Sequence, residues 1–204
     1  DFGDGDDLLV NEGFIKTSFT NLGGEYTEFA NLETFINAGV LTMQGEFAGL
    51  GFDAARDRTV TGGDYEGSGL GILAIDAYLG QVGSTADILQ VDGSTFGQTL
   101  VNINVVNVGA GAYNPLGITF AEVQGGASAL SNFIIDPATS NAVRGGNNVI
   151  DKGLFFYDVA LVDTPTVSNP DGQEFRLIGA PDQEAFELPA LISGAQSIWH
   201  ESAG

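Results

Sequence analysis

The chain has 204 residues, of which 27 are acidic and six are lysine or arginine, so its formal net charge is −21. A field of this sign repels phosphate backbones and anionic lipid headgroups, which excludes nucleic-acid binding through a basic patch. Because there is no cysteine, disulfides, thiolate metal centres and thiol nucleophiles are excluded as well. The 30 glycines, the 14 phenylalanines and the low charged fraction of 16% are typical of short strands separated by turns, which predicts an all-β chain.

A repeat with a spacing of 26 residues opens the chain. The segment LVNEGFIKT at residues 9–17 is similar to FINAGVLTM at residues 35–43, and Asn11 corresponds to Asn37. A turn followed by an alternating β-type run, repeated at a fixed period in the twenties, is the sequence pattern of a stacked solenoid. One such unit cannot bury its apolar face alone and must pack on its neighbour. The repeat therefore predicts an elongated β-solenoid.

Strand-like runs separated by glycine-rich turns continue along the chain, with hardly a helical period between them. The clearest alternation lies within residues 98–108, where Val101, Ile103 and Val105 would share one face of a strand and the asparagines between them the other. The other predicted strands, in chain order, lie within residues 71–80, 86–93, 117–125, 154–162 and 174–179.

The two halves of the chain differ in regularity. From residue 99 the strands become longer and less evenly spaced, an aromatic cluster appears at Phe155, Phe156 and Tyr157, and five of the six prolines lie between residues 137 and 189. A solenoid needs an atypical end unit that closes its exposed core. We therefore predict one continuous body with solenoid rungs at 1–98 and a capping region at 99–204.

A succession of motifs in the second half resembles a known family. Residues 65–107 combine a glycine-rich lead-in, a D-x-L-x-V-x-G step and a G-x-T-x-hydrophobic strand, and the blocks 153–162, 174–182 and 187–204 follow in order. The motif positions are Asp87, Leu89, Val91 and Gly93, then Gly97, Thr99 and Leu100. Over residues 65–204 this order resembles the C-terminal passenger region of bacterial autotransporters of the pertactin-like kind.

The resemblance implies a right-handed parallel β-helix whose C-terminal cap is an autochaperone region. It further implies that the passenger crosses the outer membrane C-terminus first, and that the C-terminal rungs act as a template for the rest. The implied partner is the protein's own translocator barrel, and the implied location is the bacterial cell surface or the medium. We expect a mature or leaderless fragment that lacks this barrel and has no membrane-inserted segment. A host ligand, if there is one, would bind a part of the passenger that lies N-terminal to this fragment.

Two acidic segments are candidate binding or catalytic sites. Residues 3–9, GDGDDLL, contain most of a calcium-binding nonapeptide repeat, but Phe2 replaces its first glycine and no second copy follows. Between Asp53 and Arg58, an arginine base beside carboxylate-held calcium would suit a polysaccharide lyase. We expect an acidic loop in the first case and local ion pairing, involving Arg56, Asp57 and Arg58, in the second.

The remaining candidates are a histidine and aromatic residues. His200 is the only histidine, which excludes multi-histidine metal sites, and we expect it to face solvent beside Trp199. A sugar-stacking stripe could be formed by Phe14, Phe19, Phe29 and Phe35. We predict instead that these rings stack in the core, because large apolar side chains at repeating inward positions hold a solenoid together.

The sequence therefore predicts a non-enzymatic exported β-solenoid that serves as folding nucleus and stalk of an autotransporter passenger. We assign no catalytic, cofactor-binding or metal-binding residue and no cofactor. Two alternatives remain open. One is a surface adhesin or interaction module, and the other is a carbohydrate-active β-helix enzyme, which would need a groove-facing cluster of acidic and arginine side chains.

Overall fold

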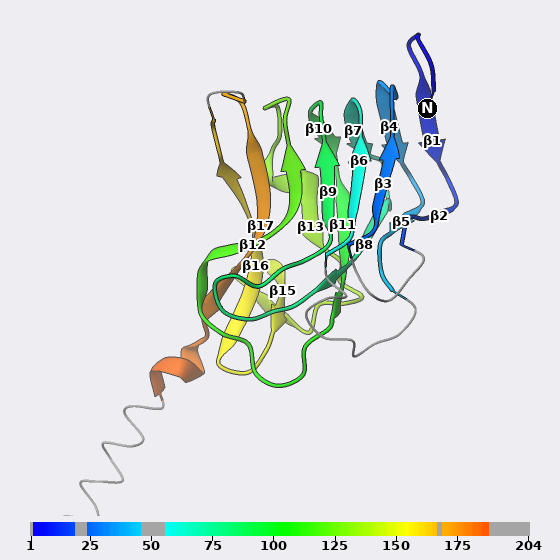
Figure 1. The fold of residues 1–204 in the computed structure, drawn as a ribbon. Helices are drawn as coiled ribbons and strands as arrows, with labels where there is room; N and C mark the ends of the chain where they lie inside the picture. The colour runs from blue at the N-terminus through cyan, green and yellow to red at the C-terminus, as the bar shows by residue number, and fades with distance from the viewer. Residues whose placement is uncertain (1, 19–23, 46–55, 167–168, 188–204) are drawn as a thin grey trace, which may run out of the picture.

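The computed structural model describes residues 2–18, 24–45, 56–166 and 169–187. Within them the backbone winds through four turns, and each turn adds one strand to each of three sheets (Figure 1). The strands of the turns, in chain order, are β1 (Leu8–Asn11), β2 (Phe14–Lys16) and β3 (Tyr26–Phe29); β4 (Thr34–Asn37), β5 (Val40–Thr42) and β6 (Arg58–Thr61); β7 (Asp64–Gly67), β8 (Ile72–Ala77) and β9 (Ile88–Val91); β10 (Thr95–Gly97), β11 (Thr99–Val105) and β12 (Asn114–Val123).

After the fourth turn the chain changes its mode of pairing. The remaining elements are a 3-10 turn η2 (Leu130–Asn132), β13 (Phe133–Ile135), β14 (Ala142–Arg144), β15 (Asn147–Asp151), β16 (Phe155–Asp163) and β17 (Gln173–Pro181), followed by helical residues 183–187. β13 still pairs in parallel with β11, whereas β14 to β17 pair in antiparallel fashion with one another and with β12. The structure is thus a parallel β-solenoid with an antiparallel extension at its C-terminal end.

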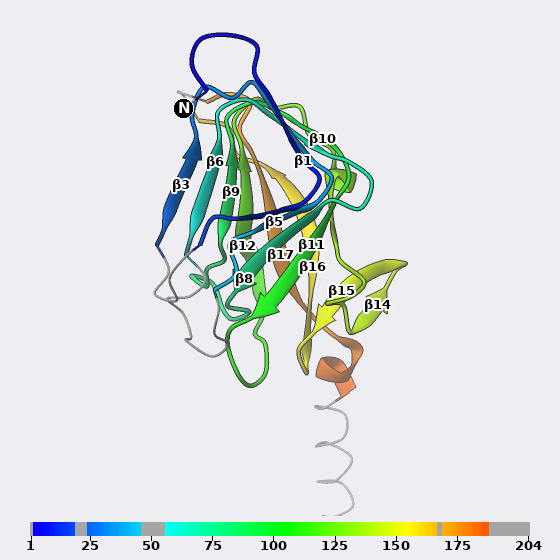
Figure 2. The same cartoon turned by 90° about the vertical axis from the view of Figure 1, so that its right-hand side faces the viewer.

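The three sheets have different lengths. The first sheet has the order β1-β4-β7-β10, and the second has the order β2-β5-β8-β11-β13. The third continues from β3-β6-β9-β12 into β17-β16-β15-β14. In Figure 2 the strands of the successive turns overlie one another, and the antiparallel strands lie beyond the fourth turn. Every strand run predicted from the sequence is found, as β8, β9, β11, β12, β16 and β17.

The predicted repeat is confirmed as the register of the first two turns. Asn11 pairs with Asn37 and Phe14 with Val40, both at a separation of 26 residues. The Asn11 side chain donates to Asn37 Oδ1 at 2.8 Å, and Asn37 Nδ2 in turn donates to the Tyr65 hydroxyl at 3.0 Å. This buried polar ladder satisfies the groups that the turns bring inside, which is a requirement for stacking them.

The alternation predicted for residues 98–108 is also confirmed. Val101 and Ile103 are buried and Val105 is partly buried, while the asparagines between them lie on the outer face of β11. Asn102 donates to Asp136 Oδ2 at 2.9 Å and Asn104 to Asp76 Oδ1 at 2.6 Å. These side chains connect β11 to the neighbouring strands on both sides.

A row of aromatic rings runs through the core along the solenoid. The centroids of Phe35 and Tyr65 are 5.8 Å apart, and those of Tyr65 and Phe133 are 5.9 Å apart. The core prediction holds for Phe35, which is fully buried, and for the partly buried Phe29, whose ring lies 5.4 Å from it. These rings join successive turns by apolar contact.

For Phe14 the core prediction was wrong, because its side chain is 67% exposed. Phe14 occupies an outward position of the second sheet, since its register partner Val40 precedes the fully buried Leu41 in β5. Successive strand residues point to opposite faces, so Ile15 and not Phe14 turns toward the core. Phe19 lies outside the described residues.

Candidate functional site: the two ends of the solenoid

The C-terminal end of the solenoid is covered by the antiparallel strands. β12 pairs in parallel with β9 on one side and antiparallel with β17 on the other, so this one strand joins the stack to its cover. β17 then pairs with β16 along its full length, from Gln173 to Pro181. We call β12 to β17, with the segments between them, the cap.

Three phenylalanine rings from different elements of the cap meet at its base. Phe133 of β13 lies 4.6 Å from Phe175 of β17 and 5.8 Å from Phe120 of β12, measured between ring centroids. None of the three side chains is exposed. Because Phe133 also stacks on Tyr65 of β7, the cluster continues the aromatic row of the turns into the cap.

Tyr157 of β16 forms hydrogen bonds with the segment that precedes β12. Its ring is fully buried, and its hydroxyl accepts from the Ala112 N–H and donates to the Ala112 carbonyl, both at 2.9 Å. Burial raises the pKa of this phenol, so it stays a neutral donor. Phe155, two residues earlier on β16, packs against the same core. The aromatic cluster noticed in the sequence therefore attaches β16 to the segment before β12.

Two arginines connect strands that are distant in sequence. Arg144 of β14 pairs with Asp182, which follows β17, and with Asp151 of β15 at 3.3 Å. Arg58 of β6 pairs with Glu122 of β12 at 2.6 Å, across β9. The expectation of local pairing was therefore wrong for Arg58, whose partner lies 64 residues away because stacking brings the two strands together.

The N-terminal end of the solenoid is open. Within the described residues, β1, β2 and β3 each pair on one side only, with the corresponding strand of the second turn. Large apolar side chains are exposed along these strands: Leu8 is 59%, Phe14 67% and Tyr26 61% accessible. Free strand edges beside apolar side chains form a template on which another strand can pair.

Three aspartates meet where the second and third sheets approach one another. Asp57, Asp76 and Asp87 are all buried. The two carboxyl oxygens of Asp87 accept backbone N–H bonds from Asp57 at 2.9 Å and from Asp76 at 2.7 Å. Burial, followed by the neighbouring carboxylates, raises the pKa of Asp87 to about 9, and burial also raises the pKa of Asp57 and of Asp76. Asp87 thus joins two turns through their backbone.

Sequence reasoning missed this cluster, although Asp87 was part of the quoted motif. The signal was present in the chain: Asp57 and Asp87 are 30 residues apart and each directly precedes a strand of the third sheet. Glu25 precedes the equivalent strand of the first turn, and its N–H donates to Asp57 Oδ1 at 2.8 Å. An acidic residue before β3, β6 and β9 is therefore a repeated feature of this corner in the first three turns.

The aspartate cluster predicts that the fold is more stable at pH 5 than at pH 9. The pKa of Asp87 in the folded state lies above the ordinary aspartate pKa of 3.8, so between these values the folded state binds more protons than the unfolded state and stability falls as the pH rises. The slope is at most about 1.4 kcal/mol per pH unit for one carboxyl. Chemical denaturation at several pH values measures it. Asp87→Asn should be destabilised at pH 5, because an amide nitrogen cannot accept a backbone N–H, and its stability should then change less with pH.

Asp92→Asn is the matched control, because Asp92 is exposed on the same turn. It should leave the slope of stability against pH unchanged. A slope in Asp87→Asn equal to that of the wild type would show that the buried aspartate does not take up the proton.

The other residues singled out in the sequence are placed as follows. Of residues 3–9, Leu8 and Leu9 belong to β1, and the acidic residues before them lie beside the second turn, where the Asp7 N–H donates to Glu33 Oε2 at 2.7 Å and the Phe2 N–H to the Ala30 carbonyl at 3.1 Å. In the described part of the chain, no group of three or more histidine, aspartate or glutamate side chains is arranged to hold a metal ion. Asp53, Trp199 and His200 lie outside the described residues.

Comparison with known proteins agrees with the architecture. The family model for Autochaperone Domain Type 1 matches residues 35–145, which is more than half of the chain. The chain belongs to this family. The matched range begins in β4 and ends just after β14, so it covers three turns of the solenoid and the beginning of the cap. No curated protein matches the sequence.

Membership of the autochaperone family carries several consequences. The chain is part of an autotransporter passenger, which implies a location at the cell surface or in the medium and a translocator barrel as its partner. The family is non-catalytic. In the described residues, no helix has both the length and the apolar character needed to cross a bilayer.

Proposed function

We propose that this autochaperone region nucleates folding of the passenger and then remains as its stalk on the outer membrane. The observation that carries the proposal is the difference between the two ends of the described stack: antiparallel strands cover its C-terminal end, whereas β1, β2 and β3 each keep one edge on which a further strand could pair. A passenger that emerges C-terminus first would then present the capped end first. Each later turn would find a finished edge on which to pair.

The energetics of a solenoid require such a nucleus. A single turn pays the entropy of ordering its backbone before it buries much apolar surface, so the first turn is the costly one. The cap reduces this cost because its pairs are antiparallel and close in sequence, as in β16–β17 and β14–β15. The ring cluster of Phe120, Phe133 and Phe175 then provides an apolar base for the fourth turn.

We further propose the division of labour suggested by the sequence, with residues 99–204 as the self-sufficient unit and residues 1–98 as dependent rungs. Residues 99–204 include β11, β12 and β13, which end the parallel pairing, together with the antiparallel strands β14 to β17. Without residues 99–204, β8 would lose its pairing with β11, β9 its pairing with β12, and Tyr65 of β7 its ring contact with Phe133. Expressed separately, 99–204 should refold and resist protease, and 1–98 should be rapidly digested.

Limited proteolysis and circular dichroism of the two fragments test this polarity, with the full chain as reference. Equal lability of both fragments would refute the proposed nucleus. Stability of 1–98 without 99–204 would reverse it.

A further inference from the structure

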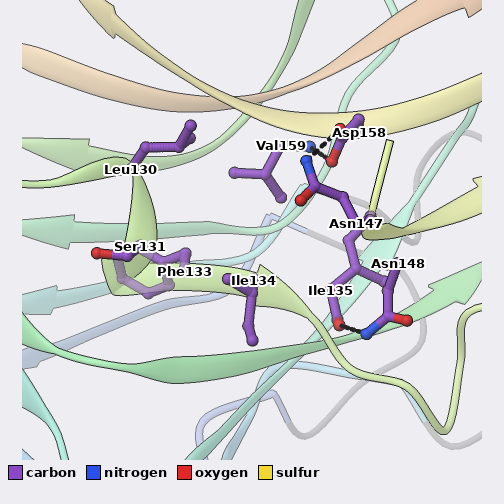
Figure 3. Close-up of a pocket in the computed structure, with 10 residues that line it drawn as sticks. Leu130, Ser131, Phe133, Ile134, Ile135, Asn147, Asn148, Asp158 and Val159 are labelled. Carbon is purple, nitrogen blue, oxygen red and sulfur yellow. Dashed lines mark hydrogen bonds between the residues drawn. The ribbon is translucent and has the colours of Figure 1, made fainter. Parts of the chain in front are cut away.

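A cavity of about 510 Å³ opens between the last strand of the second sheet and the antiparallel strands of the cap (Figure 3). Leu130, Ile134 and Val159 supply apolar surface, and Asn147, Asn148 and Asp158 supply polar groups. The volume lies within the range of about 300–1,000 Å³ that is typical of ligand sites. The cavity borders the aromatic cluster, because the buried Phe133 belongs to that cluster and also lines the cavity.

The floor of this cavity is the edge of a β-sheet. Among the described strands, β13 pairs with β11 only, so it ends the second sheet. The Asp136 N–H donates to the Val101 carbonyl, which places this N–H on the side of β11. Backbone groups of successive strand residues point alternately to the two sides. Those of Phe133 and Ile135 therefore point toward the cavity.

A side chain and not a strand meets this edge. The Ile135 carbonyl accepts a hydrogen bond from Asn148 Nδ2 at 3.2 Å, as the close-up shows. The outward row of the second sheet, in which Phe14, Val40 and Ile72 are in register, continues through Leu100 and ends at Ile134. A further strand on β13 would extend this apolar row and replace the asparagine contact.

The charges around the cavity indicate which side chains an added strand would carry. Asp158 on β16 lines the cavity, and its carboxylate accepts from Asn147 Nδ2 at 3.1 Å and from the Val159 N–H at 2.8 Å. No basic side chain lines the cavity. The whole chain carries a net charge of −21, which would repel a second copy and attract a basic segment.

We propose that this cavity binds a short extended segment of another polypeptide, with apolar and basic side chains, as an added strand on the edge of β13. Main-chain hydrogen bonds to Phe133 and Ile135 supply the pairing, which is the mode of strand addition known for sheet edges. Leu130, Ile134 and Val159 receive the apolar side chains. Asp158 pairs with the basic one.

The test uses the whole chain and a fluorescein-labelled hexapeptide in which valine alternates with threonine and lysine. Fluorescence anisotropy should show saturable binding that weakens as salt is raised. A peptide with glutamate in place of lysine should bind at least tenfold more weakly. A peptide whose backbone amides on one edge are N-methylated should also lose at least tenfold, because it cannot donate to the strand edge.

Variants locate the site. Asp158→Asn should weaken binding of the lysine peptide about threefold, as expected for a partly exposed ion pair. Leu130→Ser should weaken it through lost apolar contact, and since Leu130 is 50% exposed the fold should be retained. The matched controls are Asp163→Asn, at the exposed end of β16, and Val143→Thr, on β14 outside the cavity. Unchanged thermal midpoints verify folding, and the controls should bind like the wild type.

Three results would overturn the proposal. Equal binding of the N-methylated peptide would indicate an apolar pocket without strand pairing. Dimerisation in sedimentation that is lost in Leu130→Ser would show that a second copy occupies the edge. Absence of binding by the lysine peptide to a folded wild-type chain would show that Asn148 closes the edge.

Discussion

Replacement of Phe133 by alanine is expected to lower the free energy of unfolding by about 3–5 kcal/mol, the cost that is typical of removing a buried ring. Phe133 has no exposed surface, and its ring contacts Tyr65, Phe120 and Phe175 at the base of the cap. Domains of this kind have a total stability of only about 5–15 kcal/mol. Chemical denaturation of the purified chain measures the loss directly.

The same substitution should reduce surface display of the full-length protein, because the unfolded cap cannot supply an edge for the following turns. Phe96→Ala is the matched control, since Phe96 belongs to β10 of the adjacent turn but is 46% exposed. Its stability and display should remain near those of the wild type. Normal display of Phe133→Ala despite a measured loss of stability would separate the cap from secretion and contradict the proposed function.

The repeat could be predicted from sequence only where the turns have equal length. Asn11 and Asn37 form such a pair, and the register of the first two turns follows from it. The next partners are Asn37 with Gly67 and Val40 with Ile72, which lie farther apart because the connecting segment between β5 and β6 is longer. A fixed period fails across such an insertion, whereas the backbone pairing continues.

Predicting which strand side chains point into the core also requires the pairing register of the strands. The alternation in β11 extends over seven residues and identifies Val101 and Ile103 as buried. β2 has only three residues, so composition favoured its phenylalanine for the core, and the structure places Phe14 outside. A short strand does not contain enough alternation to fix its own face.

Contacts between residues that are distant in the sequence could not be predicted from the sequence. Phe133 and Phe175 are in contact because β17 returns antiparallel to β12. Arg58 reaches Glu122 because β6 and β12 lie on either side of β9 in the third sheet. The existence of a cap was anticipated from the resemblance, from the prolines and from the longer strands. Its aromatic cluster, its ion pairs and the free edge of β13 follow only from the topology.

Matched substitutions at the two ends are expected to change different rates, and this is the sharper test of nucleation. Phe175 in the cap and Phe35 in the second turn are both fully buried aromatic residues in contact with other rings. Either alanine variant should lose about 3–5 kcal/mol at equilibrium. Substitution of a residue in the folding nucleus mainly slows folding, whereas substitution of a residue that becomes ordered later mainly speeds unfolding.

Phe175→Ala should therefore fold roughly tenfold or more slowly than the wild type, while Phe35→Ala should fold within about threefold of it and unfold much faster. Stopped-flow refolding and unfolding across a range of denaturant give both rates for each variant. Equal slowing in the two variants would mean that the turns and the cap order together, and slower folding of Phe35→Ala alone would place the nucleus at the N-terminal end. The two substitutions remove the same kind of side chain from equally buried sites. A difference between their folding rates therefore reports the order in which the two ends fold and not a difference in stability.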